Sequence, residues 1–165
     1  MAIIKPNNNT ISAITALPAG VGGKILQVSN FVQASGGQTV STTTYTDLTG
    51  ITLNITPSAT SSKIFLFANI EAELNVNGGN RGYGMKFLRD STVVYGSGNT
   101  YEVYIQQTST NTGQHYFPHH FAYIDSPSTT SQITYKVQVA TEGGASVPFN
   151  APQKSNMYAM EIAGW

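Results

Sequence analysis

Cysteine is absent from this sequence of 165 residues. A chain without cysteine forms no disulfide, builds no zinc site from thiolates and has no thiol nucleophile. A durable protein that lacks disulfides needs another source of stability, and burial of surface between subunits is the obvious one. The missing cysteines therefore favour an oligomer.

Charged residues are also scarce. Eight basic and eight acidic side chains cancel, and charged residues make up 10% of the sequence, where about a quarter is usual. No Lys or Arg occurs from Ser91 to Tyr135. Because proteins bind nucleic acid largely through clustered basic residues, we expect no nucleic-acid partner. A neutral surface rich in Ser, Thr, Asn and Gly resembles extracellular or virion surfaces more than cytosolic ones.

Long apolar runs are missing too, so we expect no insertion into a membrane. The first 23 residues differ from the rest, because isolated aliphatic side chains stand among Asn, Pro and Gly. These side chains are Ile3, Ile4, Ile11, Ile14 and Leu17. Thr10 could cap a short helix that Pro18 ends; a disordered leader is another interpretation. We favour an extended anchoring arm, residues 1–23, whose apolar side chains dock onto a neighbour.

From residue 24 to residue 165 the sequence predicts one domain of short strands. Apolar and polar residues alternate in stretches that Gly, Pro, Ser and Asn separate, which indicates about nine or ten strands. The longest is Lys63–Leu74, with every second side chain from Ile64 onward on one apolar face. We also predict a strand over Thr39–Thr46 and a turn at Asp47–Gly50. Regularly spaced short strands predict an all-β, antiparallel sandwich or barrel.

The remaining strands follow the same rule. Ile133–Val139 gives the cleanest alternation, and the last strand, Met157–Ala163, places Tyr158, Met160 and Ile162 on one face. Pro118 interrupts a strand over His115–Asp125. Because proline donates no backbone hydrogen bond, it predicts an edge strand or a bulge there.

Candidate catalytic groups are few. No nucleophile elbow, zinc-protease, phosphate-binding or dinucleotide motif is present, so we predict no enzyme, no catalytic residue and no cofactor. Glu71 and Glu73 share one strand face, which is more typical of a solvated surface than of a sugar-hydrolysing pair. His119 and His120 point to opposite faces and cannot bind one ion together. A metal on a three-fold axis, with one histidine from each subunit, is the alternative to ordinary strand histidines.

Aromatic residues crowd the stretch 95–121. Alternation places half of them in the core. The others, with neighbouring amides, form the kind of surface that stacks on sugar rings. The candidate glycan or receptor surface consists of Tyr95, Tyr101, Tyr104, Gln106 and Tyr116. The competing interpretation is that these residues serve the core and a subunit contact.

Four segments resemble sequence that is frequent in marine and cyanobacterial tailed-phage fibre and virion surface proteins. They are Gly23-Lys-Ile-Leu-Gln-Val, Gly50-Ile-Thr-Leu-Asn-Ile-Thr-Pro-Ser-Ala-Thr-Ser-Ser-Lys-Ile-Phe-Leu, Tyr123-Ile-Asp-Ser-Pro-Ser-Thr-Thr-Ser-Gln-Ile-Thr-Tyr-Lys-Val-Gln and Met160-Glu-Ile-Ala. Their order and spacing cover nearly the whole predicted domain. The resemblance implies a jelly-roll head domain, commonly a homotrimer, carried on an N-terminal attachment segment.

These observations lead to one main hypothesis and two alternatives. The main hypothesis is a structural protein of the virion exterior, anchored by its arm to other virion proteins of the capsid or tail. Because only 23 residues precede the predicted domain, a trimeric knob, short fibre or capsid decoration protein fits better than a long bacteriophage fibre. The alternatives are a host-attachment tip that recognises a surface glycan, and a free carbohydrate-binding module.

Overall fold

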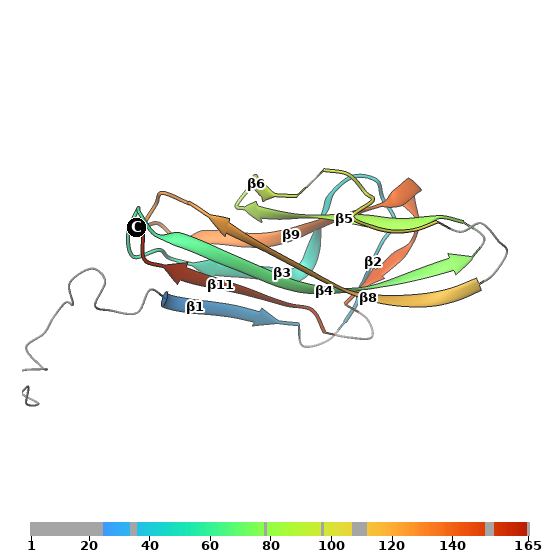
Figure 1. Cartoon of the computed structure of the whole chain (residues 1–165), viewed down its shortest axis with the longest axis horizontal. Coiled ribbons are helices and arrows are strands. Elements are labelled where there is room, and N and C mark those ends of the chain that lie inside the picture. Colours follow the sequence, from blue (N-terminus) through green and yellow to red (C-terminus); the bar gives the residue numbers. More distant parts are fainter. Residues whose placement is uncertain are drawn as a thin grey trace, which may run out of the picture.

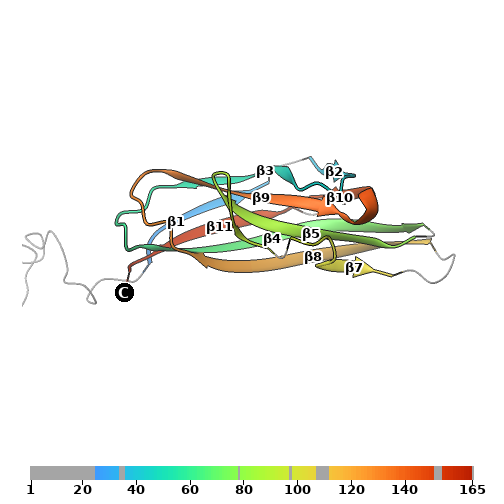
Figure 2. The same cartoon turned by 90° about the horizontal axis from the view of Figure 1, so that it is seen from above.

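The computed structural model shows two antiparallel β-sheets whose strands run along the long axis of the molecule (Figures 1 and 2). It describes residues 25–33, 36–77, 79–96, 98–106, 112–150 and 154–164, so the candidate arm, residues 1–23, lies outside the described residues. The larger sheet, sheet A, contains β1 (Ile25–Val32), β11 (Asn156–Ile162), β4 (Lys63–Asn77), β8 (Thr112–Asp125), β10 (Val147–Phe149) and β2 (Gln38–Val40). The smaller, sheet B, contains β3 (Thr46–Ile55), β9 (Ile133–Thr141), β5 (Arg81–Arg89), β6 (Thr92–Tyr95) and β7 (Val103–Ile105).

The strands pair in a nested order. β1 pairs with β11, β2 with β10, β3 with β9 and β4 with β8, and β5 pairs with both β6 and β7. The chain is therefore one long antiparallel ribbon, with β5 near its turn, folded so that its successive pairs fall into two packed sheets. This is the topology of a jelly roll, in which the first and last strands lie side by side. The predicted all-β, antiparallel sandwich of jelly-roll type is confirmed.

The core lies between the two sheets and follows the alternation of the sequence. In β4 the side chains of Ile64, Leu66, Ala68, Ile70, Ala72 and Leu74 are buried, as predicted. The inner-face side chains of β9 in sheet B are buried on the opposite side of the core. Phe87 of sheet B packs against Phe121 of sheet A with ring centroids 4.2 Å apart. Burial of each large aliphatic or aromatic side chain stabilises the fold by about 1.5–3 kcal/mol.

One predicted turn is wrong. Asp47–Gly50 lies inside β3 rather than between two strands. From the pair Asp47–Gln138 to the pair Thr52–Lys136, β3 advances five residues while β9 advances two, so the turn-forming residues form a bulge. Gly50 supplies the left-handed backbone, with a φ of 82°, and Leu48 is buried in the core. The predicted strand Thr39–Thr46 is also too long, because β2 ends at Val40.

Pro118 lies in an edge strand, one of the two predicted outcomes. The pairing of β8 with β4 continues without a register shift from Asp125 to Thr112, and Pro118 lies opposite Glu71. Among the described strands β4 is the sole partner of β8. A missing backbone donor is tolerated on the open side of such a strand. No helix among the described residues is long and apolar enough to cross a bilayer.

Candidate functional site

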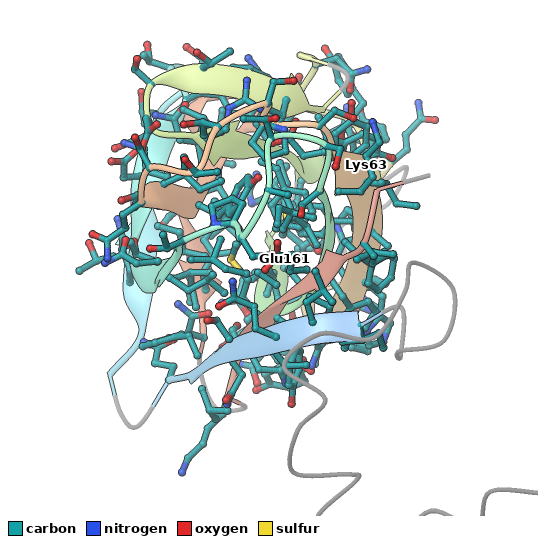
Figure 3. The ribbon with its side chains drawn as sticks, turned by 90° about the vertical axis from the view of Figure 1, so that its left-hand side faces the viewer. Lys63 and Glu161 are labelled. Carbon is teal, nitrogen blue, oxygen red and sulfur yellow. The ribbon has the colours of Figure 1, made fainter. Side chains whose placement is uncertain are left out.

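A buried carboxylate ties three separate segments together at one end of the sandwich. Glu161, on the inner face of β11, is 0% exposed. Its Oε1 accepts hydrogen bonds from the backbone N–H of Ser58 (2.7 Å) and from the hydroxyls of Ser58 and Ser62 (both 2.6 Å). Its Oε2 accepts one from Nε2 of Gln27 in β1 (2.6 Å). Figure 3, which faces this end, labels Glu161 near the middle and Lys63 toward the rim.

The hydrogen bonds keep Glu161 ionised although it is buried. Burial by itself would raise the pKa of this carboxyl group, but the bonds donated by Ser58, Ser62 and Gln27 outweigh it and hold the pKa below its usual value. Because the charged form is the one that binds these donors, Glu161 fixes the loop of residues 56–62 and the first strand to the last. We call these four residues the Glu161 cluster.

A second carboxylate joins the two sheets. Asp125, at the end of β8 in sheet A, accepts hydrogen bonds from the Tyr135 hydroxyl (2.6 Å) and from Nη1 of Arg89 (2.8 and 3.0 Å to its two oxygens). Tyr135 and Arg89 belong to sheet B. Burial and the bond to Asp125 raise the pKa of Tyr135, so its hydroxyl stays a donor. We call these three residues the Asp125 cluster.

The two clusters lie on one row of sheet A. Gln27 is opposite Glu161, Glu161 is opposite Ile64, and Ile64 is opposite Asp125. The carboxylates therefore flank a core isoleucine, about 10 Å apart across two strand spacings. Each accepts hydrogen bonds from groups of its own chain. This arrangement closes the core at one end and anchors the adjoining loops.

All four segments that resemble phage virion proteins contribute to these clusters. Gln27 belongs to the first segment, and Ser58 and Ser62 belong to the second. Asp125 and Tyr135 belong to the third, and Glu161 belongs to the fourth. Sequence reasoning did not single out either carboxylate. The signal was present, because alternation that places Tyr158 and Met160 outward places Glu161 inward with Met157 and Ala159.

The candidate glycan surface is divided among three places. Tyr101 and Tyr104 come together, with ring centroids 5.3 Å apart in an edge-to-face arrangement, and Gln106 is exposed just beyond them. Tyr95 instead packs on Tyr123, with centroids 5.3 Å apart. Tyr116 projects from the outer face of sheet A, opposite Glu73. These five residues therefore do not form one surface.

The reason for the separation lies in β5. Tyr95 is opposite Phe87 and Tyr104 is opposite Gly82 on the same edge of this strand. Five residues of strand put the two tyrosines about 17 Å apart. The pair Tyr101–Tyr104 lies beside a carboxylate: the hydroxyls of Thr100 (2.8 Å) and Tyr101 (3.2 Å) donate to Glu142. The bond to Glu142 raises the pKa of Tyr101.

The histidines separate as alternation predicted. His119 turns inward beside Tyr83, with ring centroids 5.9 Å apart, and burial lowers its pKa. His120 turns outward and stacks on Phe67 at 6.1 Å. Within the part of the chain that the structure describes, no three His, Asp or Glu side chains form a metal-binding group. A metal held between subunits stays a prediction.

Comparisons with known proteins give distant structural likeness alone. No family model and no curated protein matches the chain. Among solved structures, an infectious bursal disease virus VP2 subviral particle has a TM-score of 0.48 at 13% identity, over 84% of this chain and 33% of that one. The T13 particle of the same virus has a TM-score of 0.40 at 14% identity, over 86% and 36%. The chain thus spans about a third of those chains. Likeness this distant does not define a function, so a function has to be inferred from the residues of this chain.

Proposed function

We propose that this chain is a non-enzymatic structural protein of a virion exterior: a homotrimeric knob, short fibre or capsid decoration protein that residues 1–23 anchor to other virion proteins. One observation carries the proposal. The four segments that resemble phage virion proteins supply the Glu161 and Asp125 clusters, where their polar side chains hold loops and sheets together. Polar side chains that hold a sandwich together in this way suit a building block, because the hydrogen-bonding groups act within the domain.

The jelly-roll fold supports the proposal through its geometry. A closed sandwich of strands offers broad, rigid outer faces, and such faces are suited to contacts between subunits. The fold alone defines no activity, since one fold hosts many functions. The sparse charge of the sequence adds to this support, because a nearly neutral exterior lets many copies lie close together without strong mutual repulsion.

The deciding experiment is to locate the protein on particles. Antibodies raised against the purified chain would be used for immunogold electron microscopy of virus particles enriched from its source, with peptide mass spectrometry of the same particles. We expect labelled particles and peptides that co-purify with them through a density gradient. Particles that carry neither label nor peptides would refute a virion role.

The arm is tested on the same particles. The full-length chain with Ile11→Glu and Ile14→Glu should still fold but should no longer bind particles that lack the native protein. A matched change outside the arm, Thr52→Glu on the exposed side of β3, should bind normally. Equal binding by all three proteins would refute anchoring through residues 1–23.

A second candidate function is recognition of a host surface glycan by the Tyr101–Tyr104 pair. The observation that favours it is an exposed edge-to-face aromatic pair beside a carboxylate, which offers both a stacking surface and an acceptor for sugar hydroxyls. Glycan-array binding that Tyr101→Ala abolishes and Tyr116→Ala leaves intact would support it. An array without a reproducible hit, or equal loss in both variants, would refute it.

A further inference from the structure

An apolar area covers the outer face of sheet A at the end where the two clusters lie. Three adjacent rows of the register build it. Val28, Met160, Phe65 and Ile124 form one row, Asn30, Tyr158, Phe67 and Ala122 form the next, and Ile25, Ile162 and Lys63 form the third. All point away from the core, because their neighbours in sequence, such as Ile64 and Ala159, are buried. We call these three rows the outer apolar face.

Its composition is that of a protein–protein interface. Val28 is 55% exposed and Ile124 is 46% exposed, although both are aliphatic. The centre holds two phenylalanines, a tyrosine and a methionine, residue types that interfaces favour. A row in which three of the four side chains are polar borders it on one side; it holds Asn156, Asn69 and His120, with Val32 at its β1 end, and we call it the polar row. An apolar centre with a polar rim is the usual anatomy of a surface that a protein partner covers.

The area suits a second folded protein. With strands about 4.8 Å apart and same-face residues about 6.8 Å apart along a strand, each residue covers about 33 Å². The three rows and the polar row then cover about 500 Å². Contact over this area buries about 1,000 Å² on the two partners together, which is about the least that a specific interface needs. The outer apolar face therefore has the extent of a small protein–protein interface.

The charge of the face suits another copy of this chain. Lys63 is the one charged residue in the three rows, and its Nζ donates to the Ser126 hydroxyl at 2.8 Å. Copies of this face can thus gather around a three-fold axis without placing like charges in the apolar centre. Glu71 and Glu73 lie farther along β4, beyond the polar row, where they stay in water when the apolar rows are covered.

We propose that the outer apolar face is the surface through which copies of this chain assemble. This inference rests on the proposed function, because it names the contact that holds the trimeric knob together. Burial of Phe65, Phe67 and Met160 between subunits would remove from water the largest apolar side chains on this face. Assembly then provides the stability that the sequence does not obtain from disulfides.

The test is the solution mass of full-length variants by light scattering on a sizing column. Val28→Glu combined with Ile124→Glu places a carboxylate at each end of the row that contains Met160 and Phe65. Val93→Glu is the matched control, since Val93 is 48% exposed on β6 of the other sheet. Circular dichroism and thermal unfolding verify that each variant folds. We expect an oligomer for the native chain and for Val93→Glu, and self-association weakened at least 100-fold in the double variant, since charge without a partner is costly to bury.

Three results would overturn the inference. The first is an oligomer that the double variant leaves intact. The second is equal dissociation of the double variant and the Val93→Glu control. The third is a native chain that is monomeric, together with a hydrophobic dye that binds the Ile11→Glu, Ile14→Glu variant but not the native chain. In that case the arm of the same chain would cover the face.

Immunogold labelling tests the proposed function independently of the solution mass. A monomer that immunogold still finds on particles would refute this interface and leave the virion role standing. An oligomer that the double variant dissolves, but that is absent from particles, would support the interface and refute the virion role.

Discussion

Replacing Glu161 by glutamine tests whether a buried carboxylate holds one end of the sandwich together. The two side chains have nearly the same shape, so the change removes charge and one acceptor with little effect on packing. In each of the four hydrogen bonds to Glu161 the carboxylate accepts and the partner group donates. Glutamine brings an NH₂ group, which must face either the amide of Gln27 or the backbone N–H of Ser58. In both orientations two donors oppose each other in a buried site.

The expected loss follows from these bonds. A hydrogen bond to a charged group contributes about 1.5–3 kcal/mol, and a buried donor left without an acceptor costs about 1–3 kcal/mol. We expect Glu161→Gln to lower the free energy of unfolding by about 2–4 kcal/mol, because the hydroxyls of Ser58 and Ser62 can turn and recover part of the loss. For a domain of this size, 1 kcal/mol shifts the unfolding temperature by about 2–4 °C.

The assay is thermal and urea unfolding at pH 7 and at one fixed protein concentration, since assembly makes the midpoint depend on concentration. Glu73→Gln is the control. Glu73 lies on the outer face of the same sheet and accepts bonds from Asn75 (2.8 Å) and Gln114 (3.1 Å), and a change at such a surface position alters stability by about 0.5 kcal/mol or less. Equal stability of the two variants would refute the anchoring role of Glu161.

The pH dependence gives a second measure of the same carboxylate. Its pKa is lower in the folded chain than in the unfolded chain, so the unfolded chain takes up a proton first as the pH falls. The contribution of Glu161 to stability is therefore fully present above the unfolded pKa, near 4.3, and is lost as the pH falls through the folded value. We expect the native chain to lose more stability than Glu161→Gln over this acidic range. Parallel stability curves for the two proteins would contradict the assigned direction of the shift.

Two further substitutions address other contacts. Tyr135→Phe removes the hydroxyl that donates to Asp125 and should lower the free energy of unfolding by about 1–3 kcal/mol in urea; an unchanged midpoint would show that this bond does not hold the sheets together. Gly84→Ala would place a Cβ against the Asn99 carbonyl oxygen, so β5 and the segment before β7 must move apart, at a cost of about 1–3 kcal/mol in thermal unfolding. Gly113→Ala is its control, because the nearest atom there is 3.4 Å away; equal melting of the two variants would refute the close approach.

The parts of the fold that could be predicted from the sequence are those that depend on the local alternation of apolar and polar residues. Alternation in β4 and β9 gave the buried faces, because successive side chains of a strand point to opposite sides. It could not predict the bulge in β3. Asp47-Leu48-Thr49-Gly50 has the composition of a turn, and Gly50 does adopt a turn-like φ. The chain nevertheless continues along the same partner strand, since Leu48 and Ile51 are both buried in a core that distant strands build.

The candidate sites were harder to predict because they depend on register between distant strands. Tyr95 and Tyr104 are close in sequence, but β6 and β7 pair with different parts of β5 and separate them. Conversely, Gln27 and Glu161 are 134 residues apart in sequence and hydrogen-bonded in the fold. A sequence pattern shows which face of a strand a residue occupies. It does not show which residue lies opposite.

If residues 1–23 anchor the chain as proposed, the two clusters lie at the end of the domain where mechanical load enters. The chain enters β1 at Ile25, opposite Ile162 of the last strand, so force from an anchored arm reaches the domain where the C-terminus also lies (Figure 1). Once the pair Ile25–Ile162 has opened, peeling β1 from β11 must break the hydrogen bond from Gln27 to Glu161. That carboxylate is held in turn by the loop of residues 56–62, so the load spreads to β3 and β4. A domain that is held at one end needs firm internal contacts at that end, and the buried carboxylates lie there.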